Sequence, residues 1–373
     1  MKWTRLFSER SRRARMVVVF RATIHHKEAS PMAQQMSVLG IDIAKQVFHV
    51  VGMDDRGHVV LRKRLARSTV LTFIVNLPPL RIGMEACGSA HYWARQFREQ
   101  GHDVRLIAPQ LVKAYVKSPK NDARDAEAIC EAVTRPTMRC VPIKRVEQQD
   151  LQALHRVRER LIKARTALVN EIRGLLSEYG IILPQRITKF RALIVDQRHK
   201  EQAKLTTLSA EIFQHLYEEF LTLEKRLAYD DEKLAAIGQA HPECQRLQTI
   251  PGIGPVSATA LIAAIGDVTQ FKNGRQLAAW LGLVPREHST GGKPRLLGIS
   301  KRGDRYLRKL LIHGARATLC WGHTKGDDRS QWLRALIARR GNNRAAVALA
   351  NKNARMVWAL LAHTQAYQVR TVV

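Results

Sequence analysis

Acidic residues are scarce in this chain of 373 residues, which carries 32 Asp and Glu against 62 Lys and Arg. The formal net charge of +30 predicts a polyanionic partner, most often nucleic acid. It also predicts binding that weakens steeply as salt is raised, because a strongly basic surface displaces many counterions. A hydrophobic content of 45% excludes a disordered basic tail and indicates a folded protein.

Cysteines are also few, with five scattered along the chain and none in a C-x-x-C spacing. This pattern excludes a recognisable zinc motif and indicates a reducing cytosol. Long apolar runs are missing as well, so we expect no membrane span. Residues 1–36 are basic, and their apolar run Met16–Phe20 is too short for a signal-peptide core. We expect a loosely ordered extension there and an over-called translation start, because Met32 and Met36 stand just before the first strand.

Residues 37–145 combine strand and helix signals. Three strand-like stretches come first and are followed by alternating helix and strand. Asp42 lies inside the first strand between two isoleucines, and Glu85 ends a later strand. An acidic residue in a half-buried strand is costly unless it is paired or binds a cation. This order of strands and carboxylates predicts an α/β domain of the ribonuclease-H-like type.

Two further acidic residues, Asp122 and Asp125, stand at the start of a predicted helix. The helix should begin near Asn121, which places both side chains on one face of its first turns. Carboxylates at a helix start also complement the helix dipole, and this simpler explanation fits the pair taken alone. Together with Asp42 and Glu85, the pair predicts a metal site. Oxygen ligands suit Mg²⁺ or Mn²⁺.

Residues 146–240 are predicted to form a helical linker. Apolar residues recur at three- and four-residue spacing from Leu151 to Leu175, and a second stripe covers residues 205–237. Such stripes are typical of long amphipathic helices with a coiled-coil-like seam. The pattern fits a seam within the chain as well as a seam between protomers.

Residues 241–373 are predicted to be all helical. Pro251-Gly-Ile-Gly254 between two helical runs indicates a helix-hairpin-helix element, in which Gly252 and Gly254 let backbone amides approach a phosphate. A plain glycine-rich turn between core helices is the alternative. Residues 282–373 hold 18 Lys and Arg against 4 Asp and Glu, which places the main nucleic-acid surface there. The cations expected to contact nucleic acid are Lys293, Arg295, Lys301, Arg302 and Arg305.

A flexible, polar segment from Arg286 to Lys293 carries Ser289 and Thr290 directly before two glycines. A hydroxyl on a glycine loop among cations is suited to attack phosphate. A serine in such a segment is equally typical of a turn residue that bonds its own backbone. The residues alone favour the turn interpretation, because serine is abundant in turns.

Several motifs taken together resemble the DEDD-type bacterial transposases of the insertion sequence 110 family, most closely its insertion sequence 1111 branch. The resemblance spans roughly residues 37–365. The motifs that carry it are Gly40–Lys45, Met84–Ala86, Asn121–Asp125, Pro251–Gly254 and Gly298–Gly303. The resemblance implies a RuvC-like domain related to Holliday-junction resolvases (37–145), the helical linker (146–240) and a C-terminal transposase domain (241–373).

The resemblance also implies site residues and partners. Its four acidic residues fall on Asp42, Glu85, Asp122 and Asp125, and a C-terminal serine is the nucleophile of a covalent phosphoserine intermediate. The position that matches the family's serine is occupied by Thr290 in this sequence, but we favour the neighbouring Ser289 because a primary hydroxyl is less hindered. Expected partners are element-end and target DNA, a structured guide (bridge) RNA, and further copies of the chain in a dimer or tetramer. The expected location is the bacterial cytoplasm, at the nucleoid.

The sequence therefore predicts a recombinase that cuts and rejoins DNA to move its insertion sequence. Two other functions stay open at this point. One is a ribonuclease-H-like, junction-resolving nuclease in which metal-activated water attacks, and the other is an inactive copy that only binds nucleic acid. The Ser289 segment favours the recombinase, because a plain nuclease does not need it. The four acidic residues are all present, which argues against an inactive copy.

Overall fold

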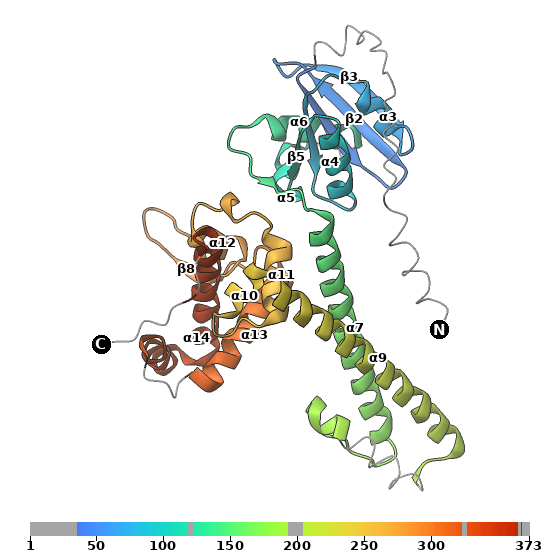
Figure 1. Ribbon diagram of the computed structural model, residues 1–373, viewed down its shortest axis with the longest axis vertical. Coiled ribbons are helices and arrows are strands. Elements are labelled where there is room, and N and C mark those ends of the chain that lie inside the picture. The colour runs from blue at the N-terminus through green and yellow to red at the C-terminus, as the bar shows by residue number, and fades with distance from the viewer. Residues whose placement is uncertain (1–35, 118–121, 193–203, 323–326, 365–366, 368–373) are drawn as a thin grey trace. The chain divides into compact units, whose positions relative to one another are not determined.

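The computed structural model describes residues 36–117, 122–192, 204–322, 327–364 and 367 (Figure 1). The chain divides into two compact units, residues 1–143 and 144–373, and each is described by itself. Most of the predicted N-terminal extension lies outside the described residues. Its last residue, Met36, is buried in the core of the first unit. The predicted boundaries near 145 and 240 remain predictions.

A six-stranded sheet in the order β3-β2-β1-β4-β5-β6 forms the first unit. Its strands are β1 (Val38–Ile43), β2 (Val47–Met53), β3 (Val59–Ala66), β4 (Arg81–Glu85), β5 (Asp103–Ile107) and β6 (Cys140–Val141). The first three strands pair antiparallel, β4 and β5 extend the sheet in parallel from β1, and β6 is antiparallel. The structure thus confirms the predicted antiparallel meander and the mixed α/β class.

Helices pack on both faces of this sheet. They are α3 (Val70–Val75), α4 (Ala90–Glu99), α5 (Pro109–Val112), the short 3₁₀ helix η2 (Lys113–Tyr115) and α6 (Asp122–Thr134). Alternate residues of each strand point to opposite faces. Ile41 and Met84 accordingly join the core under α3 and α4, whereas Val38 and Ile107 join the core under α6. Both faces of the central strands are therefore largely apolar, whereas the edge strand β3 carries the exposed cations Arg62, Lys63 and Arg64 in its middle.

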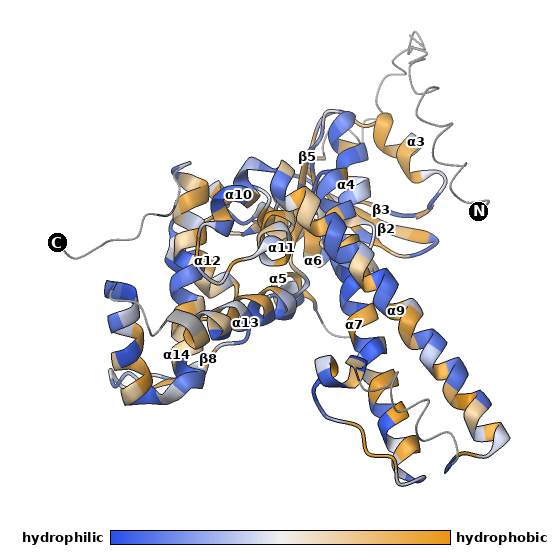
Figure 2. Cartoon of the chain, turned by 60° about the horizontal axis from the view of Figure 1, so that its bottom comes forward, coloured by the Kyte–Doolittle hydropathy of each residue, from blue (hydrophilic) through white to orange (hydrophobic). Residues whose placement is uncertain are grey.

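Two long helices open the second unit, α7 (Val146–Ser177) and α9 (Thr207–Ala240). They pack against each other through buried residues that include Leu161, Leu168 and Phe220. An Arg165–Glu224 ion pair at 3.0 Å flanks this seam. Figure 2 shows apolar and polar residues alternating along both helices, as the spacing predicted. The structure therefore contains a seam within the chain.

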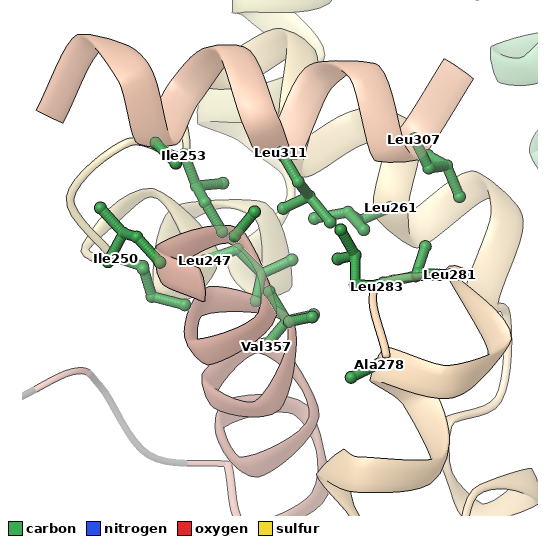
Figure 3. Packing of buried hydrophobic residues seen from close by; sticks show 14 of the residues in the cluster. Leu247, Ile250, Ile253, Leu261, Ala278, Leu281, Leu283, Leu307, Leu311 and Val357 are labelled. Carbon is green, nitrogen blue, oxygen red and sulfur yellow. The ribbon is translucent and has the colours of Figure 1, made fainter. Parts of the chain in front are cut away.

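The rest of the second unit is a helical core with one hairpin. Its elements are α10 (Pro242–Gln248), α11 (Pro255–Ile265), η4 (Val268–Gln270), α12 (Gly274–Trp280), β7 (Pro285–Glu287), β8 (Leu296–Ile299), α13 (Arg305–Gly322) and α14 (Asp328–Ala362). Leu247, Leu261, Leu311 and Val357 meet at the centre of this core (Figure 3). Gly341 has a φ of 76° and divides α14 into two helical segments.

The prediction that residues 241–373 are all helical is wrong at β7 and β8. These strands pair antiparallel, and Thr290 bridges to Lys293 across a two-residue turn. Gly291 and Gly292 both have positive φ, 56° and 75°. This conformation matches the twist of a hairpin and is easily adopted only by glycine, asparagine and aspartate. The Gly-Gly pair was therefore a hairpin signal that the interpretation as a flexible loop overlooked.

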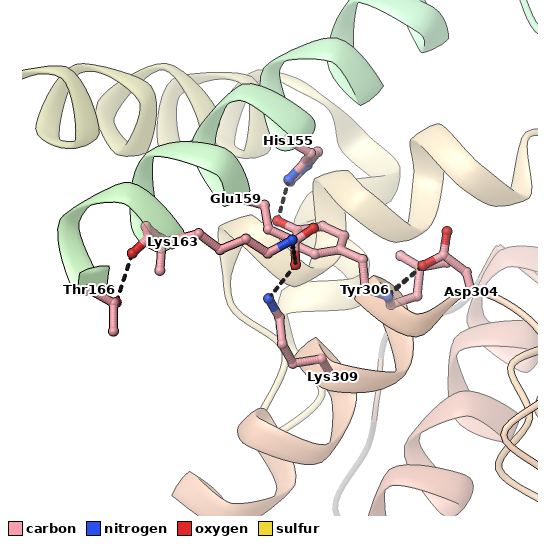
Figure 4. Close-up of polar contacts among 9 residues, drawn as sticks. His155, Glu159, Lys163, Thr166, Asp304, Tyr306 and Lys309 are labelled. Atoms are coloured by element: carbon pink, nitrogen blue, oxygen red, sulfur yellow. Dashed lines mark hydrogen bonds and ion pairs between the residues drawn. The ribbon is translucent and has the colours of Figure 1, made fainter. Parts of the chain in front are cut away.

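A buried histidine joins α7 to the helical core of the same unit. The two ring nitrogens of His155 lie 3.0 Å from the Tyr306 hydroxyl and 3.1 Å from Thr259 Oγ1 (Figure 4). Beside it, Lys309 Nζ donates to Glu159 at 2.8 Å. Burial, and to a smaller extent the charge of Arg158, lowers the pKa of His155 to about 4. The histidine is therefore neutral at pH 7.

This low pKa predicts a loss of stability in acid. Unfolding restores the pKa of His155 to about 6.5, so protonation favours the unfolded chain as the pH falls from 6.5 towards 4. We expect the free energy of unfolding to drop by about 2–3 kcal/mol between pH 7 and pH 4.5 from this residue. Urea unfolding at pH 7 and at pH 4.5 measures this drop in unfolding free energy, and the His155→Gln variant is the comparison. An equal drop in the variant would contradict the assignment.

Candidate active site

Asp42 and Glu85 lie side by side at the carboxyl ends of two neighbouring parallel strands. Ile41 of β1 is in register with Met84 of β4, so the next residue of each strand stands beside the other. Both carboxylates are half-buried. Burial raises the pKa of the nearby Cys87 thiol, and the charges of Glu85 and then Asp42 raise it further. The structure thus brings together two of the four predicted acidic residues.

Helix α6 covers the face of the sheet to which these carboxylates belong. A Cβ on Gly40 would lie 2.7 Å from Cys130 Sγ, and a Cβ on Gly83 would lie 3.0 Å from Ile129 and Val133. The helix therefore rests directly on the strand backbones. Because side chains alternate along a strand, residues two positions after these glycines point to the same face. Those residues are Asp42 and Glu85.

The same helix carries the other two predicted carboxylates in its first turn. Asp125 is half-buried and precedes Ala126, a residue in contact with Gly40. Asp122 begins the helix, but its side chain lies outside the described residues. Among the side chains that are described, no group of three or more His, Cys, Asp or Glu forms a metal site. The four-carboxylate site therefore remains a prediction.

Ser289 lies beside the turn of the β7–β8 hairpin and is exposed. Its hydroxyl donates to Glu287 Oε1 at 2.5 Å and accepts the backbone N–H of Arg295 at 3.4 Å. Residues two apart on an extended chain point the same way, which explains the contact between Ser289 and Glu287. Thr290, the alternative nucleophile, is the residue that bridges to Lys293. A carboxylate at this distance is placed to accept the proton of the serine hydroxyl.

The predicted nucleic-acid cations are exposed around this hairpin. They are Lys293, Arg295, Lys301, Arg302 and Arg305. The loop that carries Lys301 and Arg302 is fixed by close backbone contacts, because Gly282, with a φ of 71°, packs against the Arg302 backbone. Asp304 then caps α13 by accepting the N–H groups of Tyr306 and Leu307 at 2.7 and 3.0 Å. Lys301, Arg302 and Arg305 thus stand on a fixed backbone, and all five cations face solvent.

The predicted helix-hairpin-helix glycines differ in their surroundings. Gly252 has a φ of 94°, and a Cβ there would lie 2.6 Å from Thr318 Oγ1 and 2.7 Å from the Gly314 carbonyl oxygen. Gly254 is exposed at the start of α11, and a Cβ there would meet nothing within 4 Å. Gly252 is therefore required for packing against α13. The proposed contact of both glycines with nucleic acid remains a prediction.

This difference predicts opposite responses to the same substitution. Gly252→Ala forces a side chain into a left-handed conformation and into the α13 backbone, so we expect a loss of about 2–4 kcal/mol in unfolding free energy. Gly254→Ala is expected to change it by less than about 1 kcal/mol. Chemical denaturation of both variants measures the difference. Equal stabilities would contradict the packing assignment.

Comparisons with known proteins show the family of this chain. Residues 39–181 match the DEDD family model of insertion sequence 110, described as a transposase, and residues 244–331 match the model described as "Transposase IS116/IS110/IS902 family". A "Probable family 20 transposase" of Pseudomonas aeruginosa is 55% identical over 334 residues, which cover 89% of this chain and 99% of that protein. The chain belongs to the IS110/IS116/IS902 transposase family.

Other transposases are similar over nearly the same span. The "Transposase for insertion sequence element IS1111A" of Coxiella burnetii is 47% identical and matches 93% of this chain and 95% of that protein. The transposase of insertion sequence element IS1328 from Yersinia enterocolitica is 39% identical over 87% of this chain and 96% of that protein. Like its family, this transposase cleaves and transfers DNA. No helix in its described part is long and apolar enough to cross a membrane.

The carboxylate partner of Ser289 was not identified from the sequence. Glu287 stands two positions before Ser289, a spacing that pairs side chains only on an extended chain. The segment was interpreted as a flexible loop, for which this spacing has no meaning. The available signal was again the Gly-Gly turn, which places both flanking segments in strands.

Proposed function

We propose that this transposase cuts and rejoins DNA through a covalent serine–DNA intermediate, with Ser289 as the nucleophile. The observation that carries the proposal is the exposed Ser289 hydroxyl, hydrogen-bonded at 2.5 Å to the Glu287 carboxylate. Exposed cations on the same hairpin, Lys293 and Arg295, favour the approach of a phosphate. A serine that only stabilised a turn would not need a carboxylate partner.

In the proposed step, Ser289 Oγ attacks the phosphorus of a DNA phosphodiester. The hydroxyl proton passes to Glu287, a new P–Oγ bond forms, and the bond to one deoxyribose oxygen breaks. That oxygen takes up a proton from solvent water and leaves as a hydroxyl. Lys293 and Arg295 stabilise the charge that builds up on the phosphate. Attack by a DNA hydroxyl on the phosphoserine reverses the step, so rejoining needs no external energy source.

The acidic residues are proposed to hold a divalent metal ion. Adjacent Asp42 and Glu85 carry like charges that a cation would neutralise, and oxygen ligands suit Mg²⁺ or Mn²⁺. Asp125 and Asp122 of α6 would complete the ligand set. When bound, the ion would offset negative charge on the DNA phosphate. The strand order of the first unit, with its antiparallel meander and parallel extension, supports a ribonuclease-H-like, RuvC-like fold.

The remaining features of the family are proposed on more general grounds. The net charge of +30 supports binding of both DNA and a structured guide RNA. The α10–α11 turn with Gly252 and Gly254 supports a helix-hairpin-helix contact to a nucleic-acid backbone. Exposed apolar residues on α7 and α9, among them Val157 and Tyr229, support assembly of a dimer or tetramer through these helices. Such a protein would act at the nucleoid.

The proposal is tested by trapping the intermediate. The full-length protein is incubated with a nicked duplex that carries an element end, and the cross-linked peptide is identified by mass spectrometry. We expect a phosphodiester on Ser289. An adduct on Thr290 would move the nucleophile by one residue. Cleavage without any adduct would favour the nuclease that uses metal-activated water. Binding without cleavage would indicate an inactive copy.

The proton-acceptor role of Glu287 makes its own prediction. Glu287→Gln keeps the size of the side chain but removes the basic carboxylate, so adduct formation should slow by about a hundredfold or more. His288→Gln changes the neighbouring exposed side chain. It is the matched control and should react at nearly the native rate. Single-turnover adduct formation measures both variants. Equal rates for the two variants would remove Glu287 from the mechanism.

A further inference from the structure

A basic cleft lies between the base of the β7–β8 hairpin and α14. Its cavity measures about 500 Å³. Its lining includes Pro285 and Ile299 from the hairpin strands and Trp332, Arg344, Lys352 and Arg355 from α14. Asn351 of α14 donates to the Leu283 carbonyl at 3.1 Å, which fixes the helix against the strand that leads to the hairpin. The two walls of the cleft are therefore held together by a hydrogen bond.

Positive charge is concentrated along this cleft with little acidic compensation. None of Arg344, Lys352 and Arg355 forms an ion pair with any residue that the structure describes. Burial lowers the pKa of Lys352, and the nearby charges of Arg329 and Arg355 lower it further, opposed by Asp328. Cations that repel one another in a partly buried cleft are stabilised by an anion. A phosphate is the anion that a nucleic-acid enzyme meets.

An aromatic wall stands beside these cations. The Lys352 ammonium lies 4.6 Å from the centre of the half-buried Trp332 ring. A second cavity of about 470 Å³ shares Lys352 and Arg355 and adds Arg275 and Trp358. The two cavities thus follow one side of α14 as a continuous track of cations and tryptophans. Proteins that bind single strands combine a cationic groove with aromatic side chains on which bases stack.

We propose that this cleft binds an unpaired nucleotide of a single-stranded nucleic acid. The phosphate contacts Lys352, Arg355 and Arg344, and the base stacks on Trp332 in the place that the Lys352 ammonium now occupies. A cavity of about 500 Å³ is in the size range of sites for small ligands and suits one nucleotide. This proposal deepens the proposed function and rests on it, because strand exchange exposes unpaired bases near the hairpin that carries Ser289.

The test measures binding without requiring cleavage. Full-length protein is titrated into a fluorescent oligothymidylate and into a duplex of the same length. Trp332→Ala should weaken single-strand binding by about 5- to 100-fold, the range expected for one stacked base, and should change duplex binding less than about twofold. Trp280→Ala removes an exposed tryptophan outside the cleft and is the matched control. Trp332→Phe keeps a stacking surface and should restore most of the affinity.

Further measurements separate the possible outcomes. Lys352→Ala should reduce the salt dependence of single-strand binding by about one counterion. Oligouridylate in place of oligothymidylate distinguishes an RNA strand from a DNA strand. Ser289→Ala should bind like the native protein, so a failure of the serine mechanism alone leaves this result intact. The proposal would be overturned if Trp332→Ala bound single strands as tightly as Trp280→Ala does. It would also be overturned if Trp332→Ala lost as much affinity for the duplex as for the single strand.

Discussion

Ser289→Ala is expected to abolish covalent capture and strand transfer, with a loss of at least about a thousandfold, while DNA binding stays within about twofold of the native value. The variant removes the oxygen that forms the phosphoester but none of the exposed cations. The hairpin should survive, because its turn depends on Gly291 and Gly292, and Thr290 and Lys293 still bridge across it. Gel separation of the protein–DNA adduct and of transferred strands measures the loss.

Thr290→Ala is the matched control for this experiment. It removes a hydroxyl from the neighbouring residue, whose bridge to Lys293 uses backbone atoms. We expect the control to form adduct at nearly the native rate. The reverse pattern would make Thr290 the nucleophile. Native activity in both single variants and in the double variant would exclude a hydroxyl nucleophile in this segment.

The first unit was the part most open to prediction from sequence, because its strands carry regular apolar patterns. Asp42 and Glu85 could be placed on strands for that reason. That the two residues are adjacent could not be predicted, because it depends on the parallel register of β1 and β4, which are far apart in the chain. The close packing of α6 on Gly40 and Gly83 also has no local signal. A glycine in a strand gives the same pattern whether a helix or solvent lies above it.

The second unit shows where local patterns are insufficient. Sequence reasoning left two explanations for Gly252, and the contact with α13 that requires it lies far along the chain. The hairpin was mistaken for a loop because polar residues and glycines outnumber the apolar residues of β7. The cleft at Trp332 could not be predicted, because its walls come from the hairpin and from both halves of α14. Only the positive charge of that region was visible in the sequence.

Asp42→Asn is expected to stop DNA cleavage and to remove the stabilisation that Mg²⁺ gives the native protein. Asparagine keeps the size of the side chain, so without metal the melting temperature of the variant should stay close to that of the native protein. A ligand at about 100 times its dissociation constant stabilises a folded protein by about 2.7 kcal/mol. Mg²⁺ should therefore raise the melting temperature of the native protein but not that of Asp42→Asn.

Asp55→Asn is the control for this experiment, because Asp55 is an exposed acidic residue in the turn after β2. It should keep both the Mg²⁺-dependent stabilisation and cleavage. Asp125→Asn should lose both, like Asp42→Asn, if the helix contributes a ligand. Thermal unfolding with and without MgCl₂ reports on the metal site even when no DNA is present. A Mg²⁺-dependent shift that persists in Asp42→Asn would separate the metal from the strand carboxylates and contradict the four-residue site.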